Sequence, residues 1–322
     1  MSYYKLAATI SNVTFVRPAK FYFSGFSNIP HITYFLIFLC FAYIMTVAGN
    51  VFLMSVIYLV KTLHSPKYMI VFNLALADLC GSTAAIPKIL DTFLFDRTDI
   101  VFEDCLSYMF FAYFFIDVQS WTLVIMAYDR FIAICFPLRY HSIVTKLAIA
   151  AMLLLVWIVL LSISACIVGL FDRHSFCGSL VIQGFDCDMR LILDLACGDT
   201  SLISNIAYVI LILGLPLIFM LFTFLCIGYA LTKVSTVQER VKALKTCTAL
   251  LSLVAIYFLP IIITFVYLGN IHPNARIINL SLTSVFPPTL NPIIYVLQTE
   301  EIKKSVKRLF KIRVGSKIAI KK

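Results

Sequence analysis

The sequence predicts an all-α membrane protein: a bundle of seven transmembrane helices with a short amphipathic helix after the seventh. The chain has 322 residues and is 61% hydrophobic, with a mean hydropathy of +0.98, which exceeds what a soluble domain of this size buries. Its apolar runs are long and unbroken, which favours helices over barrel strands. A spanning helix takes about 20 apolar residues. Segments of that kind lie at 31–60, 68–90, 105–128, 147–170, 201–232, 246–268 and 277–297.

The distribution of basic residues predicts the orientation of this bundle. Cytosolic loops of membrane proteins are rich in Lys and Arg. With the N-terminus outside, most of the 26 Lys and Arg residues lie inside, whereas Lys5, Arg17 and Lys20 in the N-terminal tail are an exception. We therefore expect an extracellular tail at 1–30, a seven-helix domain at 31–298 and a cytoplasmic segment at 299–322. No apolar core with a small-residue cleavage site occurs in the first thirty residues, so no cleaved signal peptide is expected.

The cytoplasmic segment ends in KKSVKRLFKIRVGSKIAIKK, which interleaves basic and apolar residues. This pattern is typical of an amphipathic helix that lies on an anionic membrane surface, so membrane lipid is an expected partner. Beyond residue 312, a solubilising basic tail is an equal alternative. The net charge of +10 lies at helix ends rather than on a soluble face, so no nucleic-acid partner is expected.

The ten cysteines divide by compartment. Disulfides persist outside the cell, and the four cysteines predicted to lie there allow three pairings; they are Cys105, Cys177, Cys187 and Cys197. Within apolar segments or at their inner ends a thiol behaves mostly as a small hydrophobic group; these residues are Cys40, Cys80, Cys166, Cys226 and Cys247. Cys135, near the cytosolic face, is expected to stay reduced. Asn12 begins an Asn-Val-Thr triplet in the outer tail, which predicts a glycosylation site.

Several polar residues interrupt the predicted helices. Asn50, Asp78 and the Asn291-Pro292-Ile-Ile-Tyr295 motif each allow a simple hydrogen bond between neighbouring helices. Together they predict a polar core network, with Asp78 at its centre as the expected ligand of a sodium ion. No metal-spaced histidine cluster accompanies Asp78, and the five histidines fall near segment ends, so we expect no enzyme and no cofactor.

An acid–base pair, Asp129 and Arg130, closes the third apolar segment. Adjacent charges at a bilayer boundary are costly unless they pair, which predicts a functional role. The surrounding phrase MAYDRFIAICFPLRY at 126–140 is similar to the one carried by olfactory (odorant) receptors, a family of rhodopsin-like G-protein-coupled receptors. Further phrases carry the same resemblance: LHSPKYMIVFNLALADL, IPKIL, LACGDT, KALKTC and PPTLNPIIY.

The resemblance implies several properties of the chain. It implies a Cys105–Cys187 disulfide, which leaves Cys177–Cys197 as a second bridge. It also implies that Arg130 holds Asp129 at rest and releases it on activation. The implied partners are a small-molecule odorant and a stimulatory, olfactory-type heterotrimeric G protein that raises cyclic AMP. The implied location is the plasma membrane, in olfactory neuron cilia.

Several positions depart from the family pattern. Ala249 and Leu250 stand where the family commonly has a Ser-His pair. Gln119 stands where a Glu is common, which leaves a neutral member of the polar core. Asp117 is an acid that the resemblance does not explain.

The expected ligand pocket lies in the outer half of the bundle, under the disulfide-pinned loop. Residues that share one helical face make up most of it, and the set is Tyr108, Met109, Ala112, Tyr113, Ile116, Tyr208, Phe258, Ile261, Ile262, Phe265, Ser281 and Ser284. Ordinary helix packing produces the same stripes. Ala112 occupies the place where amine receptors of the superfamily carry an Asp, which disfavours an amine bound in that way. Asp117, more than a turn deeper, is open to two interpretations: an anchor for a cation or polar odorant, or a hydrogen-bonded acid between helices.

Two other functions compete with an odorant receptor. A receptor of the same family that senses a metabolite outside the nose fits the same residues. A transporter would show internal repeats and broken helices, and the chain shows seven spans without a repeat pair.

Overall fold

The structure is a computed structural model that describes residues 17–24, 32–95, 99–176, 180–197 (except 183, 185 and 194), 214–233, 237–266 and 273–308. Seven long helices form the bundle: α1 (Ile32–Leu59), α2 (Pro66–Leu94), α3 (Phe102–Cys135), α5 (Lys146–Phe171), α8 (Leu215–Thr232), α9 (Val237–Val266) and α10 (Pro273–Gln298). Shorter elements connect them: η1 (Lys61–Leu63), η2 (Pro137–Arg139), α4 (Tyr140–Ile143) and α6 (Met189–Leu193).

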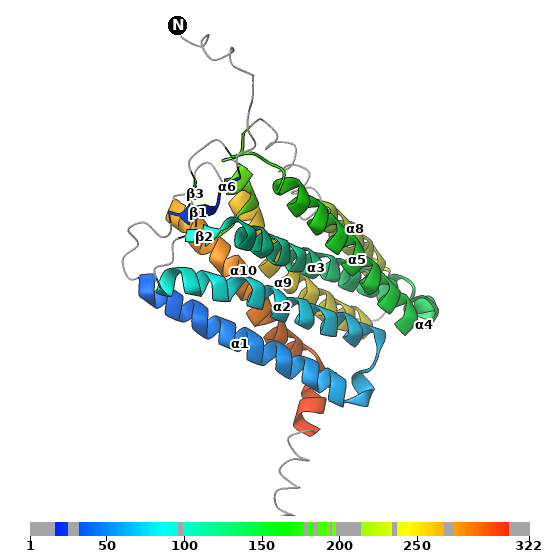
Figure 1. The fold of residues 1–322 in the computed structure, drawn as a ribbon. Helices are drawn as coiled ribbons and strands as arrows, with labels where there is room; N and C mark the ends of the chain where they lie inside the picture. The colour runs from blue at the N-terminus through cyan, green and yellow to red at the C-terminus, as the bar shows by residue number, and fades with distance from the viewer. Residues whose placement is uncertain are drawn as a thin grey trace, which may run out of the picture.

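Helix α3 is at the centre of the bundle. It packs against α2, α5, α8 and α9, while α10 packs against α1, α2 and α9 (Figure 1). Among the described residues, six helices are long and apolar enough to cross a membrane. The seventh, α10, has 26 residues and a more polar sequence that includes Pro287, Pro288 and Pro292. The predicted seven-helix fold is confirmed.

Two helices extend well beyond the apolar segments that predicted them. The segment 105–128 ended before Asp129, but α3 continues through Asp129 and Arg130 to Cys135. The predicted segment 246–268 missed the first part of α9, which starts at Val237. Apolar content marks only the part of a helix that lies in lipid, whereas backbone hydrogen bonding continues into the aqueous boundary. The predicted fifth segment, 201–232, is described from residue 214 onward.

A small sheet, which the sequence did not predict, covers one end of the bundle. Strand β1 (Lys20–Phe23) pairs antiparallel with β2 (Asp99–Val101) and parallel with β3 (Val181–Ile182). Buried aromatic side chains below these strands, Phe21, Phe102 and Phe176, stack edge to face or tilted. We call this the sheet end; the opposite end, beyond the last turn of α3, carries α4 and is called the α4 end (Figure 1).

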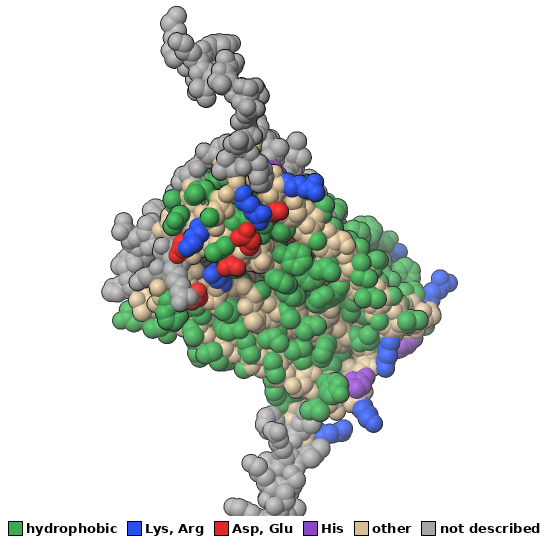
Figure 2. All heavy atoms as spheres, viewed as in Figure 1, with side chains coloured by type: hydrophobic (Ala, Val, Ile, Leu, Met, Phe, Trp, Pro, Cys, Tyr) green, Lys and Arg blue, Asp and Glu red, His purple; other side chains and the backbone are tan. Residues whose placement is uncertain are grey.

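Ion pairs attach the N-terminal strand to the sheet end. The Arg17 guanidinium lies 3.1 Å from Glu103 and 3.0 Å from Asp172, and the Lys20 amine lies 2.8 Å from Asp99. The hydrogen bond and charge of Lys20 lower the pKa of Asp99, and Asp99 in turn raises the pKa of Lys20. Figure 2 shows these acidic and basic side chains intermixed at the sheet end. Acids on other segments therefore pair with Arg17 and Lys20, two of the tail cations that are exceptions to the charge rule, while Lys5 lies outside the described residues.

The chain turns into another helical segment after α10. Residues 300–308 are helical, with Ile302 and Ser305 buried and with Lys304, Lys307 and Arg308 exposed. One face is thus apolar and the other basic, as predicted for an amphipathic helix. The basic tail beyond residue 308 lies outside the described residues.

Candidate functional site

Asp129 and Arg130 form a polar cluster at the α4 end. Arg130 Nη2 lies 3.2 Å from Asp129 Oδ2, and the Asp129 side chain is only 2% exposed. The Tyr140 hydroxyl donates to Asp129 Oδ1 at 2.8 Å. The turn through η2, which starts at Pro137, brings Tyr140 back toward α3. Burial and the neighbouring carboxylate of Asp129 raise the pKa of Tyr140, so it stays a donor. Both oxygens of Asp129 are therefore occupied.

A cavity of about 440 Å³ adjoins this cluster, between α2, α3, α9 and α10. Its charged lining comprises Lys67, Asp129, Arg130, Lys245, Glu300 and Glu301. Ala249 and Leu250, which stand where the family commonly has a Ser-His pair, line the same cavity. Tyr295 lines it as well, and its hydroxyl donates to Met126 Sδ at 3.0 Å. The α4 end thus combines an open volume with groups of both signs.

The predicted polar core occurs as three separate contacts rather than one continuous network. Asn291 Nδ2 donates to Asp78 Oδ2 at 2.7 Å and joins α10 to α2, while Asp78 Oδ1 is buried without a hydrogen bond. Asn50 Nδ2 donates to the Thr46 and Pro288 carbonyls, both at 2.9 Å. Gln119 Nε2 donates to the Ala77 carbonyl at 3.4 Å. The Asn291 contact joins α10 to α2, and the Gln119 contact joins α3 to α2. Asn50 bonds within α1 and also to α10.

The disulfide Cys105–Cys187 fixes the start of α3 to the loop before α6, which confirms the pairing that the family resemblance implied. Cys197 is also disulfide-bonded, while its expected partner Cys177 lies outside the described residues. The free thiols are Cys40, Cys80, Cys135, Cys166, Cys226 and Cys247. Cys166 is exposed on the bundle surface rather than buried, because its side of α5 faces away from the other helices.

The predicted ligand residues fall into two groups. Tyr108, Met109 and Tyr113 pack with the hydrophobic cluster at the sheet end. There the Tyr108 hydroxyl donates to Asp186 Oδ2 at 3.3 Å, and the Tyr113 hydroxyl accepts from the Met189 amide at 3.1 Å.

The second group lies deeper in the bundle. Ile116, Phe258, Ile261 and Ile262 pack with the main core. Ala112 and Ser281 are buried, and Ser284 is half-buried on α10. Tyr208, Asn12 and the side chain of Phe265 lie outside the described residues. The stripes therefore include ordinary packing positions, as the alternative interpretation held.

Three residues that the sequence argument did not single out hold the helices around α3. Tyr140 is one, although the PLRY motif contains it. The Tyr257 hydroxyl donates to the Ile116 carbonyl at 2.6 Å and ties α9 to α3. The third, Trp157, donates through Nε1 to Asn73 Oδ1 at 2.9 Å, and Asn73 Nδ2 donates to Thr122 Oγ1 at 2.9 Å. This chain of bonds joins α5, α2 and α3.

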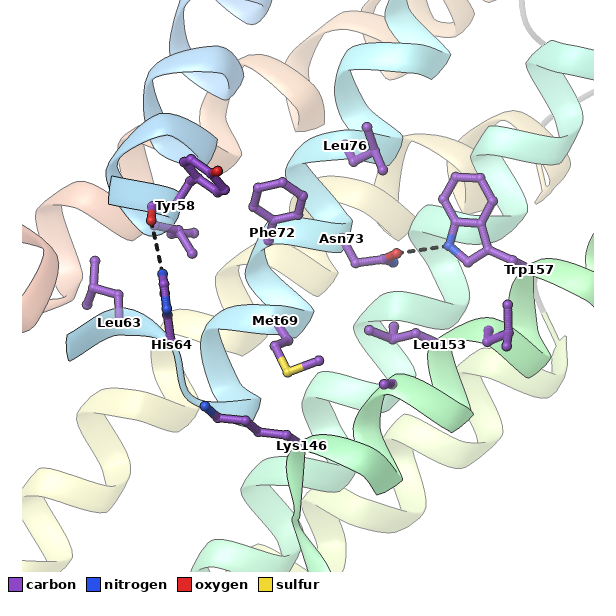
Figure 3. Close-up of a pocket in the computed structure, with 13 residues that line it drawn as sticks. Tyr58, Leu63, His64, Met69, Phe72, Asn73, Leu76, Lys146, Leu153 and Trp157 are labelled. Atoms are coloured by element: carbon purple, nitrogen blue, oxygen red, sulfur yellow. Dashed lines mark hydrogen bonds between the residues drawn. The ribbon is translucent and has the colours of Figure 1, made fainter. Parts of the chain in front are cut away.

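The Trp157–Asn73 pair lies in a groove of about 490 Å³ between α1, α2 and α5 (Figure 3). Its walls are mainly apolar, and His64 and Lys146 lie toward the α4 end. None of the predicted ligand or activation residues lines this groove.

Comparisons with known proteins bear on this arrangement. A family model described as olfactory receptor matches residues 39–313. The chain is 34% identical over 271 residues to olfactory receptor 1 of Rattus norvegicus, covering 83% of this chain and 86% of that protein. It is 32% identical over 307 residues to olfactory receptor 4E2 of Mus musculus and 33% identical over 311 residues to olfactory receptor 52K1 of Homo sapiens. Each of these two matches covers 93% of this chain and 98% of the relative.

Proposed function

This chain belongs to the olfactory receptor family of G-protein-coupled receptors, and we propose that it binds a small, largely apolar odorant and activates a stimulatory heterotrimeric G protein. In this proposal the ligand enters at the sheet end, and the G protein engages the α4 end and raises cyclic AMP. The observation that carries the proposal is the Asp129–Arg130 pair beside the 440 Å³ cavity.

The contacts of Arg130 support a role as a releasable lock. The Arg130 side chain is 20% exposed, so water and an incoming partner reach it, while Asp129 is held from both sides. An outward movement of α9 would widen the cavity that Lys245, Ala249 and Leu250 line. Arg130 would then exchange Asp129 for acceptors on the G protein.

The coupling between the two ends would run through α10. Asn291 links this helix to Asp78, and Pro292 interrupts its backbone one residue later. Tyr295, one turn beyond, contacts Met126 on α3. A proline removes a backbone donor and allows a helix to bend at that point. We also propose that Asp78 holds a sodium ion, because Oδ1 is buried without a hydrogen bond.

The disulfide and the charges support the proposed orientation. Because disulfides persist outside the cell, the Cys105–Cys187 bond supports an extracellular sheet end and an extracellular N-terminus, with Asn12 available for glycosylation. The basic face of residues 300–308 fits the anionic inner leaflet. We place the protein in the plasma membrane, in olfactory neuron cilia. The alternative, a family member that senses a metabolite in another tissue, uses the same machinery.

The test is cyclic AMP production in cells that co-express the receptor and a stimulatory olfactory-type G protein, screened against a broad odorant panel. We expect a ligand-dependent rise that Arg130→Ala abolishes at matched surface expression. Arg139→Ala is the control, because Arg139 is a nearby cation on η2 without an ion pair to an acid among the described residues. An undiminished response of Arg130→Ala would contradict the proposed lock.

A further inference from the structure

Asp117 is a buried carboxylate in the interior of α3. It is only 2% exposed, and its Oδ1 atom has no hydrogen-bond partner within the described part of the chain. An ionised carboxylate removed from water is costly unless an opposite charge or several donors compensate for it. Of the two interpretations that the sequence left open, the hydrogen-bonded acid between helices leaves this oxygen unexplained.

The Asp117 side chain lines a small closed cavity between α3, α5 and α6, under the sheet end. The cavity measures about 10 Å³, close to the space that one water-sized polar group needs. Its lining is Met109, Phe110, Tyr113, Asp117, Ser164, Ile167, Val168 and Met189. Asp117 is the one carboxyl group in this lining, and the remaining wall of the cavity is mostly apolar.

The described part of the chain does not supply a cation for this carboxylate. No ion pair with Asp117 occurs among the described residues, whose interior cations lie elsewhere. Lys67, Arg130 and Lys245 line the cavity at the α4 end, and Lys88 lines a different cavity that Phe23 and Tyr108 also border. An ionised Asp117 would therefore need a positive charge from outside the described residues, and a bound cation would supply it.

We propose that Asp117 anchors the ammonium group of an amine ligand, a proposal that rests on the receptor function above and names its ligand class. The ammonium would occupy the cavity and donate to Asp117 Oδ1, beside the Ser164 hydroxyl. Phe110 and Tyr113 also line the cavity, and aromatic rings favour a nearby cation.

The hydrocarbon part of the amine would lie against Met109 and Met189. Unbranched methionine side chains repack at low cost, so these two residues enlarge the cavity when the ligand enters. Small alkyl or cycloalkyl amines fit this arrangement best. Ala112 lies on the same helix, nearer the sheet end, and is not an acid. The amine is therefore held deeper in the bundle, at Asp117.

The first experiment compares matched pairs of ligands that differ only in the polar group: isoamylamine with isoamyl alcohol, and cyclohexylamine with cyclohexanol. A hydrogen bond to a charged group predicts a preference of at least about tenfold for the amine in cyclic AMP potency. Asp117→Asn keeps the shape of the side chain and removes its charge, so the amine and the alcohol become equipotent within about threefold. Ser162→Ala, at an exposed position of α5 outside the lining of this cavity, is the matched control and keeps the amine preference.

A second measurement separates this proposal from the proposed signalling. Purified receptor in nanodiscs is melted with and without each member of the pairs. We expect the amines to raise the melting temperature of the wild type and of Ser162→Ala, but not of Asp117→Asn, even if no cyclic AMP response occurs. An equal response to amines and alcohols by the wild type, or a preference that survives in Asp117→Asn, would overturn the amine site. Either of these results would leave the proposed receptor function untouched, because the cyclic AMP assay with Arg130→Ala tests that function separately.

Discussion

The two ends of the bundle are built in opposite ways. At the sheet end a disulfide, three strands, three ion pairs and a cluster of buried aromatic side chains close the structure, and the described cavities there measure about 10 Å³. At the α4 end a cavity of about 440 Å³ is bordered by charged side chains, and polar contacts such as Tyr140–Asp129 add to the apolar packing of the main core.

This difference indicates where the molecule can move. Covalent and apolar contacts at the sheet end are lost only with large free-energy changes, whereas one neutral hydrogen bond contributes about 0.5–1.5 kcal/mol. A ligand of modest affinity can therefore rearrange the α4 end and leave the sheet end intact. Variants at the Cys105–Cys187 disulfide and at the Asn291–Asp78 contact test this difference directly. Variants at Tyr140 and Lys20 refine it.

The largest effect is expected from Cys105→Ser. It releases the loop that precedes α6 from α3 and should reduce the free energy of unfolding by about 2–5 kcal/mol. Thermal unfolding of purified receptor and surface expression measure the loss. Cys166→Ser is the matched control, because this thiol is free and exposed on α5. If both variants unfolded at the wild-type temperature, the sheet end would not be the rigid one.

The next largest loss of stability is expected at the Asn291–Asp78 hydrogen bond, which lies between the two ends. Asn291→Leu removes the donor to Asp78 and leaves that buried carboxyl without a hydrogen bond, at a cost of about 1–3 kcal/mol. Unfolding of the two single variants Asn291→Leu and Asp78→Leu and of the double variant gives the interaction energy. We expect the double variant to lose less than the sum of the single losses. Additive losses would show that the two side chains act independently.

A smaller effect is expected at the α4 end from Tyr140→Phe. It removes one hydrogen bond to Asp129, about 0.5–1.5 kcal/mol, and so raises ligand-independent cyclic AMP about two- to tenfold. Tyr58→Phe serves as the control, because Tyr58 is 74% exposed on the surface of α1. Basal signalling of Tyr140→Phe equal to that of the control would mean that this bond does not hold the resting state.

The smallest effect is a pH dependence of strand β1. The pKa of Asp99 is lowered by Lys20, so the pair stabilises the strand above the ordinary carboxyl range near pH 4, and the contribution is lost as the pH falls below it. Hydrogen exchange at Tyr22 and Ser24, whose amides donate to Leu180 and Ile182, reports the strand. We expect Lys20→Gln to exchange faster than the wild type at pH 6. The difference should shrink as the pH falls further below 4, and a difference that did not change with pH would assign the effect to another contact.

The sequence predicted the helical bundle well because lipid imposes a strong rule. A segment in the membrane must satisfy its own backbone, so length and apolar content identify the helices. The same rule misplaced the start of α9 and the end of α3, since it applies only inside the lipid. The sheet was not predicted: β1 has four residues and its partners lie far along the chain, so no local pattern marks the pairing.

The sequence alone therefore determined the fold class and the family, together with the positions of the charged motif and of the cysteines. The tertiary structure decided which buried polar atoms have partners. Asp117 and Asp129 are acids on the same helix, and sequence patterns treat them alike. The turn through η2 brings Tyr140 to Asp129 beside Arg130, whereas methionine, aromatic and aliphatic side chains surround Asp117. The free-energy cost of a buried charge depends on what packs against it, and only the folded chain specifies that.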